Sequence, residues 1–491
     1  MNLKPDQWIA LLPILITSAT IVVVMLAIAA HRHHRWNATL CVVGLNFALF
    51  SCAYVWLSGV APQPVTPLLV IDHFSLFYMG LILATTLVCV TLSHAYMEGY
   101  QGNREEIYLL LALAGLGGLT LVCARHFASF FIGLELMSVP LYGMIAYPQG
   151  DRRALEGGIK YLVLSAVASA FILFGMALIY ARTGTLDFAQ MSPRLLQAQS
   201  LHDLLLLTGG ALLLVGIGFK ISVVPFHLWT PDVYQGAPAP VAAWLATASK
   251  TAVFALLLRF FVEAGAYRSP LFVNVLAALA LLSMIVGNVL ALLQNNLKRL
   301  LAYSSIAHFG YVLVAFVAGG PLAVEAVGIY LLTYVITTLA AFGVISLMSS
   351  PRGQEDAEDL FDFRGLFWRR PYLSAILTVA LLSLAGIPLT AGFIGKFYVA
   401  AAGVDARLWI LLGGLIAGSA IGLYYYLRAM AQLYLRQRWR QPFSAPLNWA
   451  MRAGGVVMVT LMALMLLLGV YPDPAINLIK AAGLTAPTAL A

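Results

Sequence analysis

Five ionisable residues lie inside long apolar segments of this sequence: Glu135, Lys220, Lys250, His308 and Lys396. An ionised side chain at the centre of a membrane helix costs about 2.5 to 3.5 kcal/mol even on lenient insertion scales, so such residues are rarely there without a use. Because the set holds three lysines and one glutamate, mutual neutralisation leaves a surplus of bases. A buried lysine gives up its proton readily, since burial and a neighbouring cation both disfavour the charged form. The series therefore predicts a path for protons.

Each of these residues also has a purely structural interpretation. Glu135 and Lys220 can form an ion pair that only fixes helix packing, and a histidine such as His308 is often a hydrogen-bonded core residue. Tyr303 and Ser304, close to His308 in the sequence, supply hydroxyls that favour the functional alternative. Arg259 and Glu263 stand four residues apart near a helix end, where snorkelling of the arginine is the simplest expectation.

The composition places these residues in a lipid bilayer. The chain is 62% hydrophobic and 10% charged, whereas soluble domains carry about 25% charged residues. In lipid every backbone polar group is paired internally, which leaves helical bundles and closed barrels. Long continuous apolar runs without two-residue alternation favour helices.

The apolar runs predict an all-α integral membrane protein with about fourteen transmembrane helices. The predicted helices span residues 8–30, 38–58, 74–97, 107–123, 125–148, 157–182, 203–235, 240–264, 271–293, 297–319, 323–348, 373–401, 405–435 and 449–471.

Proline and glycine interrupt the seventh and twelfth predicted helices at comparable places, in GIGFKISVVP (216–225) and AGIPLTAG (385–392). Proline removes a backbone donor and clashes with the preceding turn, so both helices should be broken. Helices 4–8 and 9–13 then form two five-helix units, each with its broken helix fourth. The odd helix number inverts the second unit, an arrangement typical of secondary transporters with an ion path near the broken helices.

These features divide the chain into four regions: a three-helix segment (1–106), a first repeat (107–264), a second, inverted repeat (265–436) and a C-terminal helix (437–491). Lys and Arg fall roughly twice as often at the ends of the spans on one side, which predicts that side as cytoplasmic and both termini as periplasmic. The hydrophilic connection 349–371 mixes acidic and basic residues and is expected to be a solvated docking loop.

Several kinds of chemistry have no sequence signal here. The four cysteines lie in apolar stretches without C-x-x-C spacing, which argues against disulfides, zinc or an iron–sulfur cluster. The sequence has no Rossmann fingerprint, P-loop or H-E-x-x-H motif. The positive charge is scattered over loops, so no nucleic-acid partner is expected.

Two segments resemble the antiporter-like membrane subunits of respiratory complex I: FKISVVPFHLWTPDVYQGAPAP (219–240), followed by TASK (247–250), and NLKRLLAYSSIAHFGY (296–311). That family comprises subunits L, M and N and the large subunits of Mrp-type sodium/proton antiporters. The WTPD sequence at 229–232, a lysine at 396 where subunit M usually has glutamate, and no long lateral helix as in subunit L favour the bacterial subunit N branch.

The resemblance implies a proton-translocating subunit of NADH:quinone oxidoreductase in a bacterial inner membrane. Glu135 would pair with Lys220 and tune it, Lys250 would be the central relay, His308 would continue the path and Lys396 would be the terminal group. NADH, FMN, iron–sulfur clusters and quinone would bind partner subunits, and this chain would hold no cofactor or metal. Expected neighbours are subunit M and small membrane subunits such as K and J.

Three alternatives remain open at this point. The first is an Mrp-type sodium/proton antiporter subunit, and the second is a membrane scaffold that holds pumping neighbours in place. The third is a membrane-embedded transferase that uses His308, for which no second catalytic group stands nearby in the sequence.

Overall fold

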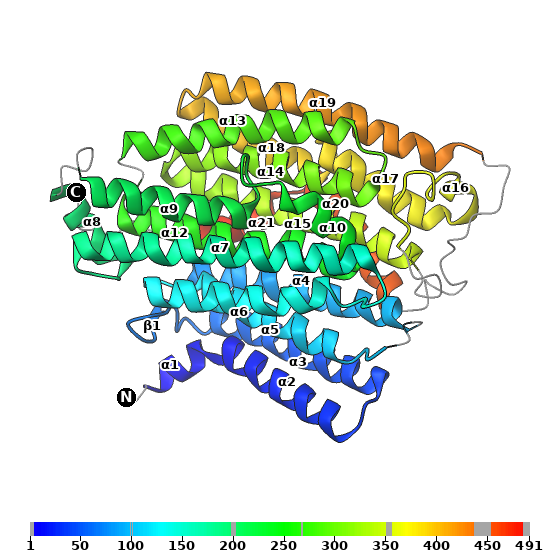
Figure 1. Cartoon of the computed structure of the whole chain (residues 1–491), viewed down its shortest axis with the longest axis horizontal. Coiled ribbons are helices and arrows are strands. Elements are labelled where there is room, and N and C mark those ends of the chain that lie inside the picture. Colours follow the sequence, from blue (N-terminus) through cyan, green and yellow to red (C-terminus); the bar gives the residue numbers. More distant parts are fainter. Residues whose placement is uncertain are drawn as a thin grey trace.

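The computed structural model describes residues 4–98, 100, 102–197, 203–266, 269–349, 356–436 and 453–484, with only the backbone of 193–197. Most helices run side by side along one direction (Figure 1). The N-terminal segment contains α1 (Pro5–Ala10), α2 (Leu12–Ala30), α3 (His34–Leu57) and α4 (His73–Met97). Between α3 and α4 lies a two-stranded antiparallel hairpin, β1 (Gln63–Pro64) and β2 (Val70–Ile71).

The next helices correspond to the first predicted repeat. They are α5 (Glu106–Val122), α6 (Phe127–Ile145), α7 (Arg152–Thr183), α8 (Phe188–Gln197), α9 (Leu204–Ile221), α10 (Trp229–Gly236), α11 (Ala239–Trp244) and α12 (Lys250–Ala264). A π-helical turn, Leu245–Ser249, joins α11 to α12.

The remaining helices are α13 (Pro270–Leu292), α14 (Leu297–Ala318), α15 (Gly320–Met348), α16 (Leu366–Arg369), α17 (Pro371–Ala385), α18 (Ala391–Asp405), α19 (Trp409–Tyr434), α20 (Ala453–Val470) and α21 (Asp473–Ala481). In Figure 1 α13 and α19 lie at the edge opposite the N-terminal helices α1 and α2.

The helix inventory confirms an all-α membrane protein. Within the described residues, twelve helical segments are long and apolar enough to cross a membrane. Two further predicted spans correspond to the shorter apolar helices α5 and α17. The predicted number of fourteen spans stays a prediction.

The centre of the bundle is formed by the helices that carry two of the candidate residues. In the most apolar part of each span, 100% of the α11–α12 residues, 89% of α14 and 94% of α15 are buried, against 28% of α2. Lys250 opens α12 and His308 lies on α14. These two side chains are therefore kept from lipid by the chain itself.

Both predicted helix breaks are present. After α9 the backbone turns left-handed at Ser222, with φ 62°, and α10 begins at Trp229. After α17 it turns left-handed at Gly386, with φ 84°, and α18 begins at Ala391. α5 packs on α6 as α13 packs on α14, and α7 packs on α9 as α15 packs on α17 and α18. The inversion of the repeats and the four region boundaries stay predictions.

One connection differs from its predicted form. Part of the loop 349–371 folds back on the chain, burying Ala357, Phe363 and Leu366. Its backbone bonds to the start of α14, where the Leu297 N–H donates to the Glu358 carbonyl. The described part, from residue 356 onward, is a packed cap because its apolar side chains alternate with the charged ones; residues 350–355 lie outside the described structure.

Candidate buried charge path

Lys220 lies in the last turn of α9 and is 4% exposed. Its Nζ donates hydrogen bonds to Ser138 Oγ at 2.8 Å and to Ser165 Oγ at 2.7 Å. The Tyr142 hydroxyl also donates to Ser165 Oγ, at 2.9 Å. Hydroxyl groups from α6 and α7 thus hold an ammonium at the end of the first half-helix.

Glu135 does not form the predicted ion pair with Lys220, because no carboxylate oxygen lies within 4 Å of that ammonium in the described structure. Instead Glu135 Oε1 accepts a hydrogen bond of 2.5 Å from Ser169 Oγ. Ser165 and Ser169 are one turn apart on α7. Glu135 and Lys220 therefore each bind a serine of α7, and the two serines are four residues apart.

Lys250 has no solvent exposure. Its Nζ donates to Ser222 Oγ at 2.5 Å and to the Ile221 carbonyl at 3.2 Å. Both acceptors belong to the break after α9. Thr230 on α10 donates to the same Ser222 hydroxyl at 2.8 Å. The break after α9 therefore presents a main-chain and a hydroxyl oxygen to Lys250.

Aromatic rings enclose the rest of the Lys250 ammonium. Nζ lies 5.0 Å from the centre of the Phe309 ring, 5.6 Å from Trp229 and 6.0 Å from Tyr234. A cation within about 6 Å of a ring face is attracted by the π electrons. The π-helical turn immediately before Lys250 alters the helical phase there, and such turns are frequent at functional sites.

Several buried hydroxyls lie between Lys250 and His308. Ser305 Oγ lies beside the hydroxyls of Tyr234 and Tyr334, and none of the three makes a well-formed hydrogen bond. The Tyr334 ring packs on Phe309 and on His308, with ring centres 5.1 and 5.4 Å apart. A buried polar atom without a partner costs about 1–3 kcal/mol, and buried water usually satisfies such groups.

His308 is 5% exposed and contacts two tyrosine hydroxyls. Its Nδ1 lies 2.6 Å from Tyr330 Oη on α15, and its Nε2 lies 3.1 Å from Tyr426 Oη on α19. Tyr426 in turn bonds to Ser304. Both ring nitrogens therefore face a tyrosine hydroxyl, and these partners orient the imidazole and set which nitrogen carries the proton.

Lys396 on α18 is 9% exposed and belongs to the second break. Its Nζ donates to the Ala385 carbonyl at 2.9 Å and lies 5.3 Å from the centre of the Tyr311 ring. Tyr311 is the residue that packs edge-on against His308, with ring centres 5.6 Å apart. Tyr311 therefore lies close to both of the last two members of the predicted series.

Residues 124–422 match the protein family described as NADH:quinone oxidoreductase/Mrp antiporter, TM. The chain belongs to this family. Two relatives named NADH-quinone oxidoreductase subunit N, from Ectopseudomonas mendocina and Chromohalobacter salexigens, are each 57% identical. The first alignment covers 97% of both chains, and the second covers 96% of this chain and 98% of the relative. The resemblance to subunit N is therefore confirmed, and this chain is a membrane subunit of the NADH-quinone oxidoreductase type.

Solved structures agree with this membership. A chain of respiratory complex I from Thermus thermophilus has a TM-score of 0.82 at 35% identity, over 96% of this chain and 100% of that one. A chain of the Mrp complex from a Dietzia species has a TM-score of 0.84 at 21% identity, over 97% of each chain. At that identity the second likeness shows the fold alone.

Two buried cations of this NADH-quinone oxidoreductase family member have partners that the sequence did not reveal. Arg259 does not snorkel: its guanidinium is 1% exposed and binds both carboxylate oxygens of Asp72 at 2.8 Å. Lys298, also 1% exposed, binds Asp356 at 2.7 Å and the carbonyls of Gln235 and Ala237. Both partners are far away in the sequence, so spacing gave no signal for them.

Glu156 and Lys160, four residues apart on α7, form an ion pair at 2.6 Å, and Lys160 also binds Asp232 at 2.7 Å. His308 gains partners from α15 and α19, whereas Tyr303 makes no described bond to it. Tyrosines on two different helices could not be assigned to one histidine without the fold.

Proposed function

We propose that this chain conducts protons within an NADH:quinone oxidoreductase, along Glu135, Lys220, Lys250, His308 and Lys396. The observation that carries the proposal is the state of three of the buried lysines, Lys220, Lys250 and Lys396. None of them has a carboxylate within 4 Å in the described structure, and each is held by hydroxyl or carbonyl oxygens. A purely structural lysine in an apolar core would be neutralised by a partner.

The hydroxyl partners suit transfer because a hydroxyl both donates and accepts. A proton that leaves Lys220 can pass through serine hydroxyls and bound water toward Ser222 and Lys250. From Lys250 the unsatisfied hydroxyls of Ser305 and Tyr334 lead to His308, which exchanges protons at either ring nitrogen. Lys396 then receives the charge beside the second break.

Glu135 is the natural point of coupling to the rest of the enzyme. It is only partly buried in this chain, whereas Lys220 is enclosed. A change in the charge near Glu135 acts on Lys220 through the low-dielectric space between α6, α7 and α9. The chain thus responds to events in a neighbouring subunit without holding the redox reaction itself.

The remaining assignments follow from the family and the sequence. We place NADH, FMN, iron–sulfur clusters and quinone in partner subunits, because this sequence has no motif for them. Subunit M and small subunits such as K and J are the proposed membrane neighbours. The distribution of Lys and Arg favours both termini on the periplasmic side of the inner membrane.

The decisive experiment is NADH-driven proton uptake in membrane vesicles that carry Lys220→Ala or Lys250→Ala. Complex assembly and quinone-reductase activity are measured alongside, and Lys480→Ala, at an exposed lysine, is the matched control. We expect both path variants to assemble and to lose coupled uptake, while the control keeps it. If the assembled complex with Lys250→Ala took up protons like the wild type, the conducting role would be rejected in favour of the scaffold alternative.

A further inference from the structure

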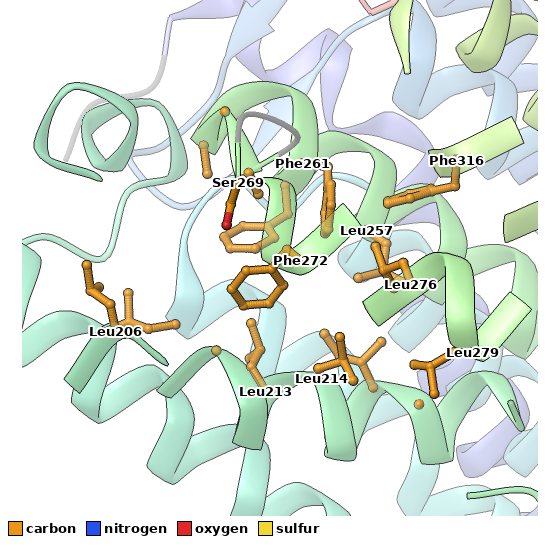
Figure 2. A pocket seen from close by; sticks show the side chains of 18 of the residues that line it. Leu206, Leu213, Leu214, Leu257, Phe261, Ser269, Phe272, Leu276, Leu279 and Phe316 are labelled. Atoms are coloured by element: carbon orange, nitrogen blue, oxygen red, sulfur yellow. The ribbon is translucent and has the colours of Figure 1, made fainter. Parts of the chain in front are cut away.

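The structure contains a cavity of about 340 Å³ outside the charge path, in the seam between the two halves of the bundle. Its walls come mainly from α9 of the first half, α13 of the second half and α12 behind them. Figure 2 shows side chains of these helices facing one another across the space. α9 packs on α7 and α12, and α13 packs on α14 and α19, whereas the backbones of α9 and α13 are not closely packed on each other.

The lining excludes a polar ligand. It consists of aliphatic, aromatic and glycine residues, and its only side-chain polar groups are the hydroxyls of Ser192 and Ser269. No charged residue lines it, so it is no branch of the lysine series. Its volume falls within the roughly 300–1,000 Å³ typical of ligand sites. An occupant must therefore be an apolar chain or ring.

The depth of the cavity decides which apolar group fits. Along α13 the lining runs from Ser269, just before the helix, to Leu279. Those ten residues rise by about 15 Å at about 1.5 Å each. The hydrocarbon core of a bilayer is about 30 Å thick, so the cavity spans the depth of one leaflet. That is the space which one lipid acyl chain occupies.

The cavity reaches the surface between half-buried residues of the two helices. Leu207 and Leu214 on α9 and Phe272 on α13 are each partly exposed and also line the cavity. The tip of the Phe272 ring rests on α9 at Gly210, where a side-chain carbon would lie 2.1 Å from it. A chain can thus enter sideways from the bilayer, beside the Phe272 ring.

We propose that this cavity binds the acyl chain of a membrane phospholipid. Its deep end touches Gly218 and Ile221, in the last turns of α9. The bound chain fills the seam and supports the half-helix whose final carbonyl binds Lys250. The site is thus a lipid site inside the subunit, and its existence does not depend on whether the lysines conduct protons.

The test uses the whole complex in vesicles of phosphatidylethanolamine and phosphatidylglycerol, with a trace of phosphatidylethanolamine that carries a diazirine near the end of one acyl chain. After illumination, cross-linked positions are mapped by mass spectrometry. We expect adducts on cavity residues such as Leu213 and Leu279. Leu276→Trp should fill the cavity and lower these adducts about tenfold, since excluding even two methylenes weakens binding by about that factor.

Val275→Trp is the matched control, because Val275 is the neighbouring residue on α13, is 37% exposed and lies outside the lining. Its cavity adducts should equal those of the wild type. If Leu276→Trp prevents assembly, Leu214→Phe and its control Leu205→Phe repeat the comparison on α9. Wild-type protein without cavity adducts would overturn the proposal, as would adducts that a long-tailed quinone displaces and unlabelled phospholipid does not.

Discussion

Lys396 donates a hydrogen bond from Nζ to the carbonyl oxygen of Ala385, at 2.9 Å, across the break between α17 and α18. Ala385 is the last residue of α17, so the ammonium lies at the negative end of that half-helix. Lys250 has the same relation to Ile221, the last residue of α9, at 3.2 Å. Each break therefore binds a lysine through the carboxyl end of a half-helix, and a change in the charge of the lysine is felt by that helix.

Replacing Lys396 separates its capping function from proton exchange. Arginine stays protonated, so Lys396→Arg should keep a donor near the Ala385 carbonyl but release no proton. Lys396→Met should lose both, at a cost of about 1–2 kcal/mol for the unsatisfied carbonyl. We expect neither variant to support NADH-driven proton uptake, and only Lys396→Met to speed hydrogen–deuterium exchange at the end of α17. Wild-type uptake by Lys396→Arg would contradict an exchanging function for Lys396.

Ser222 keeps a left-handed backbone conformation that costs a non-glycine residue roughly 1–2 kcal/mol, whereas Gly386 occupies the equivalent turn without that cost. The serine is explained by its hydroxyl, which accepts from Lys250 and Thr230. Ser222→Gly should relax the turn but slow proton uptake, because Lys250 loses an acceptor. Ser222→Ala should also take up protons more slowly than the wild type, and it should be less stable than Ser222→Gly because alanine keeps the cost of the left-handed backbone. Equal uptake by wild type and both variants would show that the Ser222 hydroxyl is dispensable.

Tyr330 and Tyr426 should control transfer through His308, because each binds one of its ring nitrogens. Tyr330→Phe or Tyr426→Phe removes one hydroxyl while keeping the ring, and the net loss in stability should be about 1 kcal/mol. Coupled proton uptake should fall in both variants with the complex assembled. The control is Tyr424→Phe, two residues before Tyr426 on α19, where the side chain is 64% exposed; this variant should leave uptake unchanged.

The ion pair of Asp72 with Arg259 should be structural and insensitive to neutral pH. Burial would raise the pKa of the Asp72 carboxyl, but the Arg259 guanidinium outweighs it, so the pKa lies below its usual value. A lowered acidic pKa contributes stability that is complete above about pH 3.9, the ordinary aspartate value, and is lost as the pH falls through the folded pKa.

The corresponding experiment is thermal inactivation of the complex that carries Asp72→Asn. Removing one partner of a buried pair typically costs 3–5 kcal/mol, so we expect earlier inactivation at pH 7 and a smaller difference from the wild type below about pH 4. A difference that grows as the pH falls would contradict the assignment.

Asp356 should be the residue that fixes the folded part of the 349–371 loop. It binds the buried Lys298 ammonium at 2.7 Å and accepts a hydrogen bond from Tyr96 at 2.7 Å. Asp356→Asn leaves Lys298 as a buried cation without its counter-charge, so the loop should become sensitive to limited proteolysis. Asp359→Asn, at an exposed aspartate in the same loop, should cleave like the wild type. Comparing these two variants distinguishes a loop that is packed on its own chain from a loop that is ordered only by partner subunits.

The sequence by itself determined the membrane class, the helix positions, the two breaks and the five ionisable residues within apolar segments. These follow from local quantities: the length of an apolar run, the steric effect of proline and the cost of a charge in lipid. The pattern around residues 219–250 was specific enough to indicate the family, which the comparisons confirmed.

Only the tertiary structure decided which groups surround each ionisable residue. Partners distant in the sequence surround these residues: serines bind Glu135 and Lys220, tyrosines bind His308, and an aspartate binds Arg259. A hydrogen bond depends on positions to within a few tenths of an ångström, and apolar periodicity carries no such information. The apolar cavity between α9 and α13 could not be predicted for the same reason. Its walls are mainly leucines and phenylalanines, and only the packing of the helices shows that a space lies between them.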